Sequence, residues 1–507
     1  MKTVNPYSGM KITVMGLGLN GGGLESARYL AGRGALVTVT DTKDETALAP
    51  SIEALEGEKG ISGKIRYCLG RHEMEDFTAA DMVIKNPGVL PSSPYLSASK
   101  RIETDISLFL AAAPARLLAV TGSKGKSGTA SALHWALVKA RERGLVEGRA
   151  WLGGNITVSP LRFLDQTGEK DDVVLELSSW QLADLRLCGS QKSGNVPLKP
   201  RCAIITSIMR DHQDRYSRME DYVNDKREIY RHQDTSDLTV ASADDDWGKS
   251  FLEESPGRRL AFSAHPLAEE EAGGWLSGNG PGFVRLSPGA ESFPAVPADP
   301  AVPGRHQKKN LLAAALALLD LGFAADNVRE SLGSYPGIEH RLEMFHETPG
   351  NGAAPGAASL SIRFYNDSAA TIPEAAAAAV EALAGDDGKK PLILVTGGTD
   401  KNLDYGPLAK AAAKAKAVIL LTGTGSEKIV PLLTAGGVPF FGPFGDLEKA
   451  AACAIEKAGD LAKAGQGAKA GTVFVVLSPG CASFGMFKNE FDRGRRWKET
   501  VERLSLR

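Results

Sequence analysis

Residues 116–131 read RLLAVTGSKGKSGTAS, and this stretch decides the fold class of the chain. A short apolar run is followed by two glycines, then by the pair Lys126 and Ser127 and a helix-like segment. This layout is typical of a phosphate-binding loop between a strand and a helix. The general pattern G-x-x-x-x-G-K-[ST] places a glycine five residues before Gly125, where this sequence has Val120. The loop is therefore a shortened form.

The residue types of this loop suit a nucleotide. Gly122 and Gly125 allow the backbone to approach phosphate oxygens, and Lys126 can reach β- and γ-phosphates. Ser127 can ligate Mg²⁺, and Lys124 adds a second positive charge. The alternative is a lysine-rich surface turn without a ligand.

The same arrangement of an apolar run, a glycine-bearing stretch and a helix-like segment recurs along the chain. Its instances are KITVMGLGLNGGG, RLLAVTGSKGKS, DVVLELSSWQ, CAIITSIMRDHQD, PLILVTGGTDK, AVILLTGTGSE and VFVVLSPGCAS. Continuous Val, Ile and Leu runs indicate strands buried on both faces of a parallel sheet. Their alternation with helices predicts an α/β fold with ligands beyond the carboxyl ends of the strands.

Three domains are predicted: 1–112, 113–337 and 338–507. The second contains SGNGPGFVRLSPGAESFPAVPADPAVPG, whose prolines and glycines indicate hairpins and loops. The third contains alanine-rich runs, EAAAAAVEALAG and LAKAAAKAKAV, which indicate helices packed on a sheet. A mobile loop is expected from about 347 to 359.

Composition excludes several classes of protein. The 507 residues are 43% hydrophobic and 24% charged, with a net charge of −2, which gives no electrostatic reason to expect nucleic acid. No apolar run approaches the ~20 residues of a membrane span, and the first residues do not resemble a signal peptide. Five cysteines without a C-x-x-C pair indicate a reducing cytoplasm. We expect a cytoplasmic monomer.

A second glycine motif, G-x-G-x-x-G, lies at residues 16–21 after an apolar run, and Asp41 ends the next run. Glycines of this kind bring backbone close to a pyrophosphate, and such an acidic residue commonly binds a ribose hydroxyl. The motif predicts a site for NAD or for a nucleotide-linked substrate. A tight turn that binds nothing is the alternative.

Acidic and imidazole groups follow two further runs. Glu176 ends a strand of the buried type, where a carboxylate is costly unless it is paired or binds a metal. Asp211, His212 and Asp214 follow the next strand, and Lys226 lies in a later helix. Taken singly, each could be structural, but together with the phosphate loop they predict a Mg²⁺-nucleotide site.

Weaker signals lie in the last third of the chain. GRHQKKN carries Asn310, a group that suits a base or a substrate but equally a helix cap. Arg341 can bind phosphate oxygens, Asp367 can accept from ribose hydroxyls, and Lys401 adds a further positive charge.

In order, these motifs resemble those of the Mur ligases, from Gly16 to Gly494. The matching segments are TGSKGKSGTA, ELSSWQL, DHQDRY with Lys226, GRHQKKN, GIEHRLE, NDSAAT, GGTDKN and LSPGCASFGMFKNEFDRG. The resemblance implies an N-terminal Rossmann-like domain for a UDP-linked substrate, a central ATP-binding domain with a mostly parallel sheet, and a C-terminal Rossmann-like domain for an amino acid. The last segment resembles the branch that joins D-glutamate to UDP-N-acetylmuramoyl-L-alanine through an acyl phosphate, in peptidoglycan precursor synthesis.

The resemblance also implies site residues. The UDP-linked substrate would contact Gly18, Leu19, Asn20, Asp41, Thr42, Asn155, Ser178 and Gln181. ATP would contact Gly122, Ser123, Lys124, Gly125, Lys126, Ser127, Gly128, Asn310, Arg341 and Asp367. The amino acid would contact Lys401, Ser483 and Phe491, and the catalytic residues would be Lys126, His212 and Lys226. Mg²⁺ would be held by Ser127, Glu176, His212 and Lys226, the last as a carbamate.

Several positions depart from the family pattern, and other functions remain open. Ala369 stands where the family has a lysine, and Phe491 is shifted by one place. Alternatives are another Mur ligase, an L-glutamate-adding variant, a folylpolyglutamate synthase, an NAD(P)-dependent oxidoreductase built on the first glycine motif, and a non-catalytic nucleotide-binding module. The glycine motif argues against the synthase, because it implies a separate domain for UDP.

Overall fold

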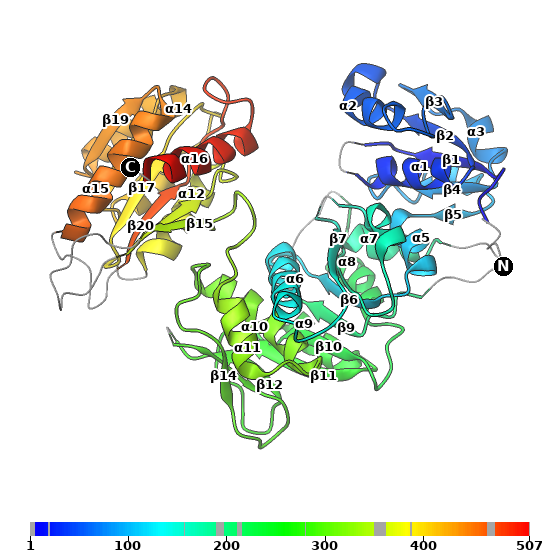
Figure 1. Cartoon of the computed structure of the whole chain (residues 1–507), viewed down its shortest axis with the longest axis horizontal. Helices are drawn as coiled ribbons and strands as arrows, with labels where there is room; N and C mark the ends of the chain where they lie inside the picture. The colour runs from blue at the N-terminus through cyan, green and yellow to red at the C-terminus, as the bar shows by residue number, and fades with distance from the viewer. Residues whose placement is uncertain are drawn as a thin grey trace. The chain divides into compact units, whose positions relative to one another are not determined.

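The structure is a computed structural model of the whole chain, shown in Figure 1. It describes residues 6–18, 21–156, 158–188, 197–209, 215–278, 280–348, 361–385, 388–463 and 472–505. These residues form three sheets, and each sheet lies within one of the three predicted domain ranges. The α/β prediction is confirmed, because strands and helices alternate and most strands pair in parallel.

The first sheet has the strand order β3-β2-β1-β4-β5, and all its pairings are parallel. The strands are β1 (Lys11–Met15), β2 (Leu36–Asp41), β3 (Ile65–Leu69), β4 (Met82–Lys85) and β5 (Ile102–Glu103). The helices are α1 (Gly22–Gly32), α2 (Glu45–Glu56), α3 (Met74–Thr78), α4 (Pro94–Ser97) and α5 (Asp105–Ala112). The chain order reverses between β1 and β4, which places a ligand crevice beyond the carboxyl end of β1.

The second sheet has nine strands in the order β14-β13-β12-β11-β10-β9-β6-β8-β7. They are β6 (Arg116–Thr121), β7 (Ala150–Gly154), β8 (Asp172–Glu176), β9 (Cys202–Ile205), β10 (Leu238–Ser242), β11 (Arg258–Ser263), β12 (Gly273–Leu276), β13 (Gly282–Arg285) and β14 (Phe293–Val296). The pairs β12–β13 and β13–β14 are antiparallel, so the proline- and glycine-rich stretch forms hairpins, as predicted.

Helices connect the strands of the second sheet, and two more helices come after its last strand in the chain. They are α6 (Lys126–Glu142), α7 (Ser179–Leu185), α8 (Met219–Lys226), α9 (Asp246–Glu254), α10 (Arg305–Asp320) and α11 (Ala325–Gly333). Short 3₁₀ turns are η1 (Pro160–Arg162), η2 (Leu164–Gln166) and η3 (Arg227–Ile229). In α10 the apolar residues from Leu311 to Leu319 are buried.

The third sheet has the order β15-β16-β20-β17-β18-β19, and among its described strands only β15 runs antiparallel to its neighbour. The strands are β15 (Glu343–Thr348), β16 (Ser361–Asn366), β17 (Leu392–Thr396), β18 (Ala417–Leu421), β19 (Phe440–Phe444) and β20 (Thr472–Leu477). The helices are α12 (Pro373–Ala384), α13 (Gly406–Ala412), α14 (Thr424–Ala435), α15 (Leu447–Lys463) and α16 (Glu490–Ser505).

Helices cover both faces of the third sheet. Along β17, Leu392 and Leu394 pack with the buried residues of α12, α13 and α14. Ile393 and Val395 pack on the other face with α15 and α16. A strand that is buried on both faces must be apolar at every position, which explains the continuous run LILVT.

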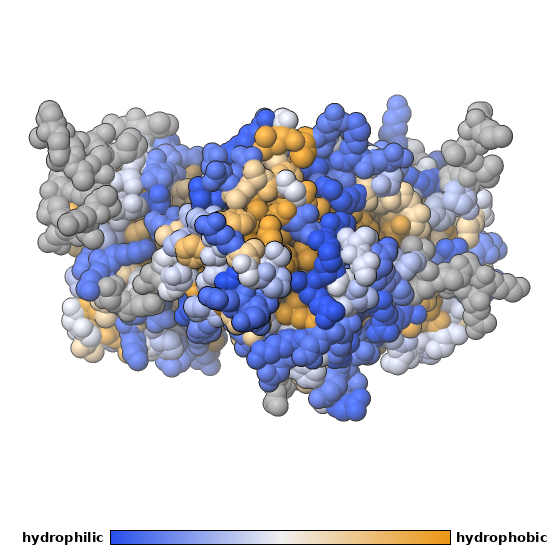
Figure 2. Space-filling model, turned by 90° about the horizontal axis from the view of Figure 1, so that it is seen from below, coloured by the Kyte–Doolittle hydropathy of each residue, from blue (hydrophilic) through white to orange (hydrophobic). Residues whose placement is uncertain are grey.

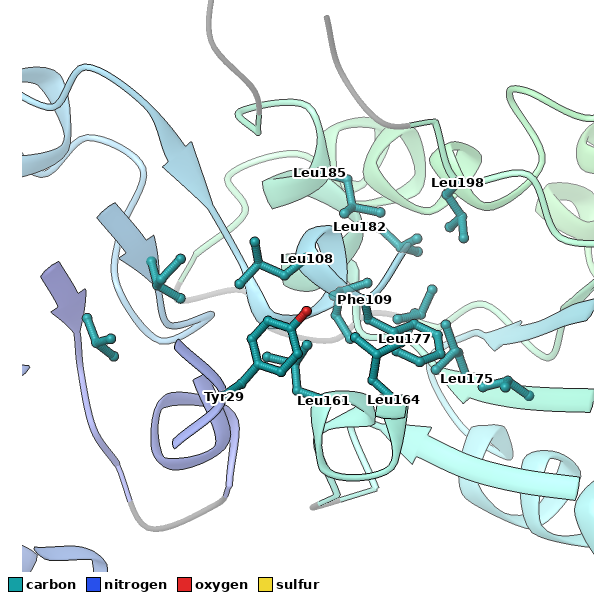
Figure 3. Packing of buried hydrophobic residues seen from close by; sticks show 14 of the residues in the cluster. Tyr29, Leu108, Phe109, Leu161, Leu164, Leu175, Leu177, Leu182, Leu185 and Leu198 are labelled. Atoms are coloured by element: carbon teal, nitrogen blue, oxygen red, sulfur yellow. The ribbon is translucent and has the colours of Figure 1, made fainter. Parts of the chain in front are cut away.

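The chain forms two compact units. One contains residues 1–298 and 309–332, and the other contains 299–308 and 333–507. The first and second sheets therefore belong to one unit. A continuous hydrophobic cluster runs between them, and Figure 3 shows Tyr29 and Leu108 beside Leu161, Leu164 and Leu182.

The seven apolar runs and the alanine-rich helices are found where they were predicted. The predicted loop from 347 is wrong at its start. Glu347 and Thr348 belong to β15, where they pair with Arg363 and Ile362 of β16. Residues 349–360 lie outside the described residues.

No helix among the described residues is long and apolar enough to span a membrane. The face in Figure 2 carries hydrophilic side chains over much of its area, with apolar ones gathered in patches between them.

Candidate active site

The phosphate loop follows an interior strand of the second sheet. It follows β6, which has β8 on one side and β9 on the other, and α6 begins at Lys126. The chain moves from β6 toward β7 and β8, then crosses back to β9. Such a reversal opens a crevice at the carboxyl end of β6, where the N-terminus of α6 also lies and favours anions.

Two glycines of the loop have no room for a side chain. Gly122 has φ +142°, and a Cβ there would lie 1.8 Å from Thr206 Oγ1. Gly125 has φ +89°, and a Cβ there would lie 2.5 Å from Asn310 Oδ1. The second contact also shows that the tertiary fold brings Asn310 to the loop.

Two lysines converge on one carbonyl of the loop. Lys126 Nζ lies 3.0 Å from the carbonyl oxygen of Gly122, and Lys226 Nζ lies 2.9 Å from the same oxygen. Lys226 is only 1% exposed, and its ammonium also lies 4.5 Å from the ring centroid of Tyr222. Lys126 and Lys226 therefore both lie at the phosphate loop, and the predicted carbamylation of Lys226 stays a prediction.

Other loop residues are held by the neighbouring strand ends. Ser123 Oγ accepts from the Met209 N–H at 2.9 Å and lies 2.8 Å from the Tyr222 hydroxyl. Lys124 forms an antiparallel bridge with Ser207. Ser127 and Gly128 lie in the first turn of α6. The predicted residue His212, with Asp211 and Asp214, lies outside the described residues.

Glu176 is the last residue of β8, next to the loop strand, and is 1% exposed. Its Oε1 accepts a hydrogen bond from Asn155 Nδ2 at 2.8 Å. Its Oε2 is buried and has no hydrogen-bond partner among the described residues. A buried carboxylate oxygen without a partner is costly unless a cation binds it, so the donor set fits Mg²⁺.

In the first sheet the glycine motif begins directly after β1. Gly16 and Gly18 have φ of +90° and +62°, and the Gly18 N–H donates to Asp41 Oδ2 at 3.2 Å. The other carboxylate oxygen of Asp41 accepts from the Lys43 N–H at 3.0 Å. Thr42 is exposed. The predicted contacts Leu19 and Asn20 lie outside the described residues.

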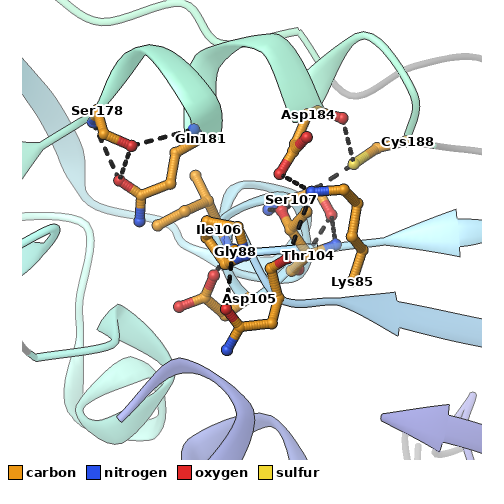
Figure 4. Close-up of polar contacts among 12 residues, drawn as sticks. Lys85, Gly88, Thr104, Asp105, Ile106, Ser107, Ser178, Gln181, Asp184 and Cys188 are labelled. Carbon is orange, nitrogen blue, oxygen red and sulfur yellow. Dashed lines mark hydrogen bonds and ion pairs between the residues drawn. The ribbon is translucent and has the colours of Figure 1, made fainter. Parts of the chain in front are cut away.

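Ser178 and Gln181 form a capping box at the start of α7. Ser178 Oγ accepts from the Gln181 N–H at 3.2 Å, and Gln181 Oε1 accepts from the Ser178 N–H at 3.1 Å (Figure 4). Both side chains therefore have a local structural role.

In the second compact unit, the predicted nucleotide residues lie beyond the end of β16. Asp367 Oδ2 accepts from Ser478 Oγ at 2.6 Å, and Oδ1 accepts from the Leu342 N–H at 3.1 Å. Burial raises the pKa of Asp367 to about 7, although these hydrogen bonds and the charge of Arg341 oppose the shift. Arg341 itself is exposed.

The predicted amino-acid residues lie at the same edge of this sheet. Lys401 follows β17 and Ser483 follows β20, and the two loops are paired by an antiparallel bridge between Thr399 and Ala482. Lys401 is exposed, whereas Ser483 is buried. Phe491 is half exposed, with its ring 5.6 Å from that of His340.

Sequence reasoning missed Arg493, which is 1% exposed. Its guanidinium donates to Ser368 Oγ and the Ser368 carbonyl, both at 2.9 Å, and to the Cys481 carbonyl at 3.2 Å. Burial lowers its pKa to about 10. Arg493 lies in FDRG, the end of the segment LSPGCASFGMFKNEFDRG, so the sequence motif included this residue. Its contacts could not be predicted because they depend on the tertiary fold.

Comparison with known proteins assigns the family. The family models described as "Mur ligase MurD-like, N-terminal domain" and "Mur ligase middle domain" match residues 10–107 and 120–318. A UDP-N-acetylmuramoylalanine–D-glutamate ligase of Treponema pallidum is 40% identical and covers 97% of each chain. The chain belongs to the Mur ligase family. The protein of the same name from Roseiflexus is 37% identical over 98% of this Mur ligase and 99% of that protein.

Solved structures agree with the Mur ligase fold. UDP-N-acetylmuramate-alanine ligase MurC of Thermotoga maritima gives a TM-score of 0.52 at 18% identity, covering 98% of this chain and 100% of that chain. MurF of Acinetobacter baumannii gives a TM-score of 0.52 at 13% identity, and the match covers 97% of this chain and 94% of that chain. At these identities the likeness shows the fold alone. The predicted family and the α/β fold with mostly parallel sheets are confirmed, and the domain bounds and the roles of individual residues stay predictions.

Proposed function

We propose that this Mur ligase joins D-glutamate to UDP-N-acetylmuramoyl-L-alanine with ATP, giving ADP and phosphate. The observation that carries the proposal is the end-to-end relationship at 40% identity with a protein named for that reaction. ATP would phosphorylate the substrate carboxylate, and the glutamate amine would then attack the acyl phosphate. The tetrahedral intermediate would lose phosphate to leave an amide.

The phosphate loop supports the ATP half of the proposal. Loop backbone at Gly122 and Gly125 can approach phosphate oxygens without obstruction by a side chain. The Lys126 ammonium would neutralise charge on the transferring phosphoryl group. Mg²⁺, held by Ser127 and the unpartnered oxygen of Glu176, would supply further neutralisation of the phosphate charge.

The remaining roles are assigned by position. Asn310 at Gly125, and Arg341 with Asp367 in the second unit, would serve the nucleotide. The first glycine loop with Asp41 would take the UDP end, and Asn155, Ser178 and Gln181 would take the muramoyl-alanine end. Lys401 and Ser483 would bind the glutamate carboxylates. We propose that Phe491 contacts the amino acid, that a second Mg²⁺ lies near His212, and that Lys226 is carbamylated.

The departure at Ala369 motivates testing the amino acid directly. Its N–H donates to the His340 carbonyl at 3.0 Å, and its methyl group offers no charge where the family has a lysine. We expect glutamate, because the lysine and serine of the paired loops supply cationic and hydroxyl groups for two carboxylates. The D enantiomer is expected because the relative at 40% identity is named for it.

The test is phosphate release with ATP, Mg²⁺ and UDP-N-acetylmuramoyl-L-alanine, with D-glutamate, L-glutamate, L-alanine and a diamino acid supplied separately. Release that depends on D-glutamate supports the proposal. Release with another amino acid would reassign the amino-acid site, and no release with any would contradict the function. Size-exclusion chromatography would test the proposed monomer, and fractionation would test the proposed cytoplasmic location.

A further inference from the structure

A buried ion pair joins the first and second sheets. Lys85 Nζ lies 2.5 Å from Asp184 Oδ2, and both side chains are 0% exposed (Figure 4). Lys85 is the last residue of β4, and Asp184 lies near the end of α7. Neither residue belongs to the first glycine loop or to the phosphate loop.

One end of the pair reaches the first glycine loop. Lys85 is followed by Asn86, whose Nδ2 donates to the Gly16 carbonyl at 3.3 Å. A Cβ on Gly16 would lie 2.9 Å from the Asn86 Cβ, so the two residues are in close contact. Lys85 Nζ also donates to the Asn86 carbonyl at 3.3 Å. The position of Lys85 therefore determines the position of Asn86, which packs on the first glycine loop.

The other end reaches the capping box of α7. Asp184 lies one helical turn after Gln181, which is bonded to Ser178 at the start of the same short helix. A helix of this length moves as a rigid piece. Displacement of Asp184 would therefore displace the two side chains assigned to the muramoyl-alanine end of the substrate.

Much of the surrounding interface is apolar, and its apolar contacts do not by themselves select one arrangement. Leu108 and Tyr29 on one side meet Leu161, Leu182 and Leu185 on the other (Figure 3). Apolar contacts are non-directional, whereas a buried ion pair has one favourable geometry. The pair is thus a directional contact at this interface, and it acts together with the buried hydrogen bond from Ser159 Oγ to Asp105 Oδ2 at 2.8 Å.

Further charged groups face the pair. The Arg215 guanidinium stacks 4.4 Å from the ring centroid of Trp180 and donates to the Pro87 carbonyl at 3.2 Å. Burial raises the pKa of Asp184 to about 6 and lowers the pKa of Lys85, and each partner opposes the shift of the other. Through its hydrogen bond to the Pro87 carbonyl, Arg215 also holds residues 86–88, which follow Lys85.

We propose that Lys85 and Asp184 are positioning residues, which hold the first glycine loop and α7 at the spacing that the two ends of the UDP-linked substrate require. The inference rests on the proposed function, because it assigns the UDP end to the glycine loop and the muramoyl-alanine end to α7. Loss of the pair should therefore weaken binding of a ligand that spans both ends of the site, while binding at each end alone is unchanged.

The test compares two ligands by isothermal titration calorimetry. UDP engages one end of the site, whereas UDP-N-acetylmuramoyl-L-alanine engages both. In Lys85→Met/Asp184→Leu, affinity for the whole substrate should fall about tenfold or more, while affinity for UDP should stay within about twofold. KM for ATP should also stay within about twofold, so the defect appears in one substrate only.

Asp184→Asn provides a second variant with nearly unchanged side-chain volume, in case the double variant does not fold. It should show the same split between UDP and the whole substrate. The matched control is Lys199→Met/Asp234→Leu, which removes an ion pair of 2.6 Å whose side chains are 44% and 55% exposed. Its affinities should equal those of the unchanged protein.

Two results in folded variants would overturn the inference: unchanged affinity for the whole substrate, or an equal loss for UDP and the whole substrate. The second would indicate local damage to the glycine loop. If the unchanged protein bound neither ligand, the proposed function would fail first, and the positioning role with it. Circular dichroism and the thermal midpoint establish that each variant is folded.

Discussion

Asn155 Nδ2 donates to Glu176 Oε1 at 2.8 Å, while Glu176 Oε2 is buried without a hydrogen-bond partner among the described residues. One oxygen of the carboxylate is thus fixed in place by an amide, and the other is left for a different partner. Beside a phosphate loop, a divalent cation is the partner that best offsets the cost of this burial.

Glu176→Gln should reduce phosphate release by about 100-fold or more, because an amide oxygen is a weaker ligand for Mg²⁺ than a carboxylate. The measurement is the rate of release as a function of Mg²⁺ concentration, which should shift toward higher concentrations. The thermal midpoint should not fall, because the variant removes a buried and half-satisfied charge. Glu254→Gln, on a partly exposed pair with Arg227, is the control. A variant with the Mg²⁺ dependence of the unchanged protein would rule out the assigned role.

Gly125→Ala should raise KM for ATP by about tenfold or more, because the added methyl group collides with Asn310 at the loop. Gly144→Ala is a matched control: it also has positive φ, at +69°, but nothing lies within 4 Å of its Cβ position. Both variants should lose about 1–2 kcal/mol of stability from the left-handed backbone. Steady-state kinetics at varied ATP concentration give the KM of each variant and so distinguish Gly125→Ala from Gly144→Ala. Equal effects on KM would show that backbone strain, and not the contact with Asn310, governs nucleotide binding.

Asp367→Asn should change the pH dependence of stability. Because burial raises the pKa of Asp367 to about 7 from an ordinary value of 3.8, the native state keeps a proton that the unfolded chain releases between these values. Stability conferred by this group therefore falls as pH rises from about 4 to about 7, and is level above that range. Urea unfolding at about pH 5 and about pH 8 should show the protein losing stability relative to the variant.

The same titration should affect the nucleotide. An ionised Asp367 accepts hydrogen bonds from ribose hydroxyls more strongly, so KM for ATP should fall as pH rises through about 7. In Asp367→Asn this dependence should be weaker. A KM profile that is identical in both proteins would exclude Asp367 from nucleotide binding.

Lys85→Met alone should lower the free energy of unfolding by about 3–5 kcal/mol, because it leaves the Asp184 carboxylate buried without its counter-charge. Lys85→Met/Asp184→Leu should recover most of this loss, since both charges are replaced by apolar side chains of similar volume. Urea denaturation measures both values. A double variant no more stable than the single one would show that packing, and not the buried charge, determines the cost.

Local patterns predicted much of the fold. Runs such as LILVT and RLLAVT become β17 and β6 because a strand buried on both faces must be apolar along its whole length. The strand, loop and helix at the phosphate loop were predictable for a similar reason, since the glycines, lysine and serine that mark them are neighbours in sequence. Glu347 and Thr348 were missed as strand residues because a polar edge strand, here β15, lacks that apolar signal.

The sequence by itself determined the family, the α/β class and the candidate residues, because each rests on short segments whose chemistry is legible in order along the chain. Only the tertiary structure decided which of them meet. Asn310 lies against Gly125, Lys226 shares the Gly122 carbonyl with Lys126, and Lys85 pairs with Asp184 across 99 positions. Such contacts join segments that are distant in sequence, and they form only when the strands of a sheet are ordered and their carboxyl ends are brought to one edge.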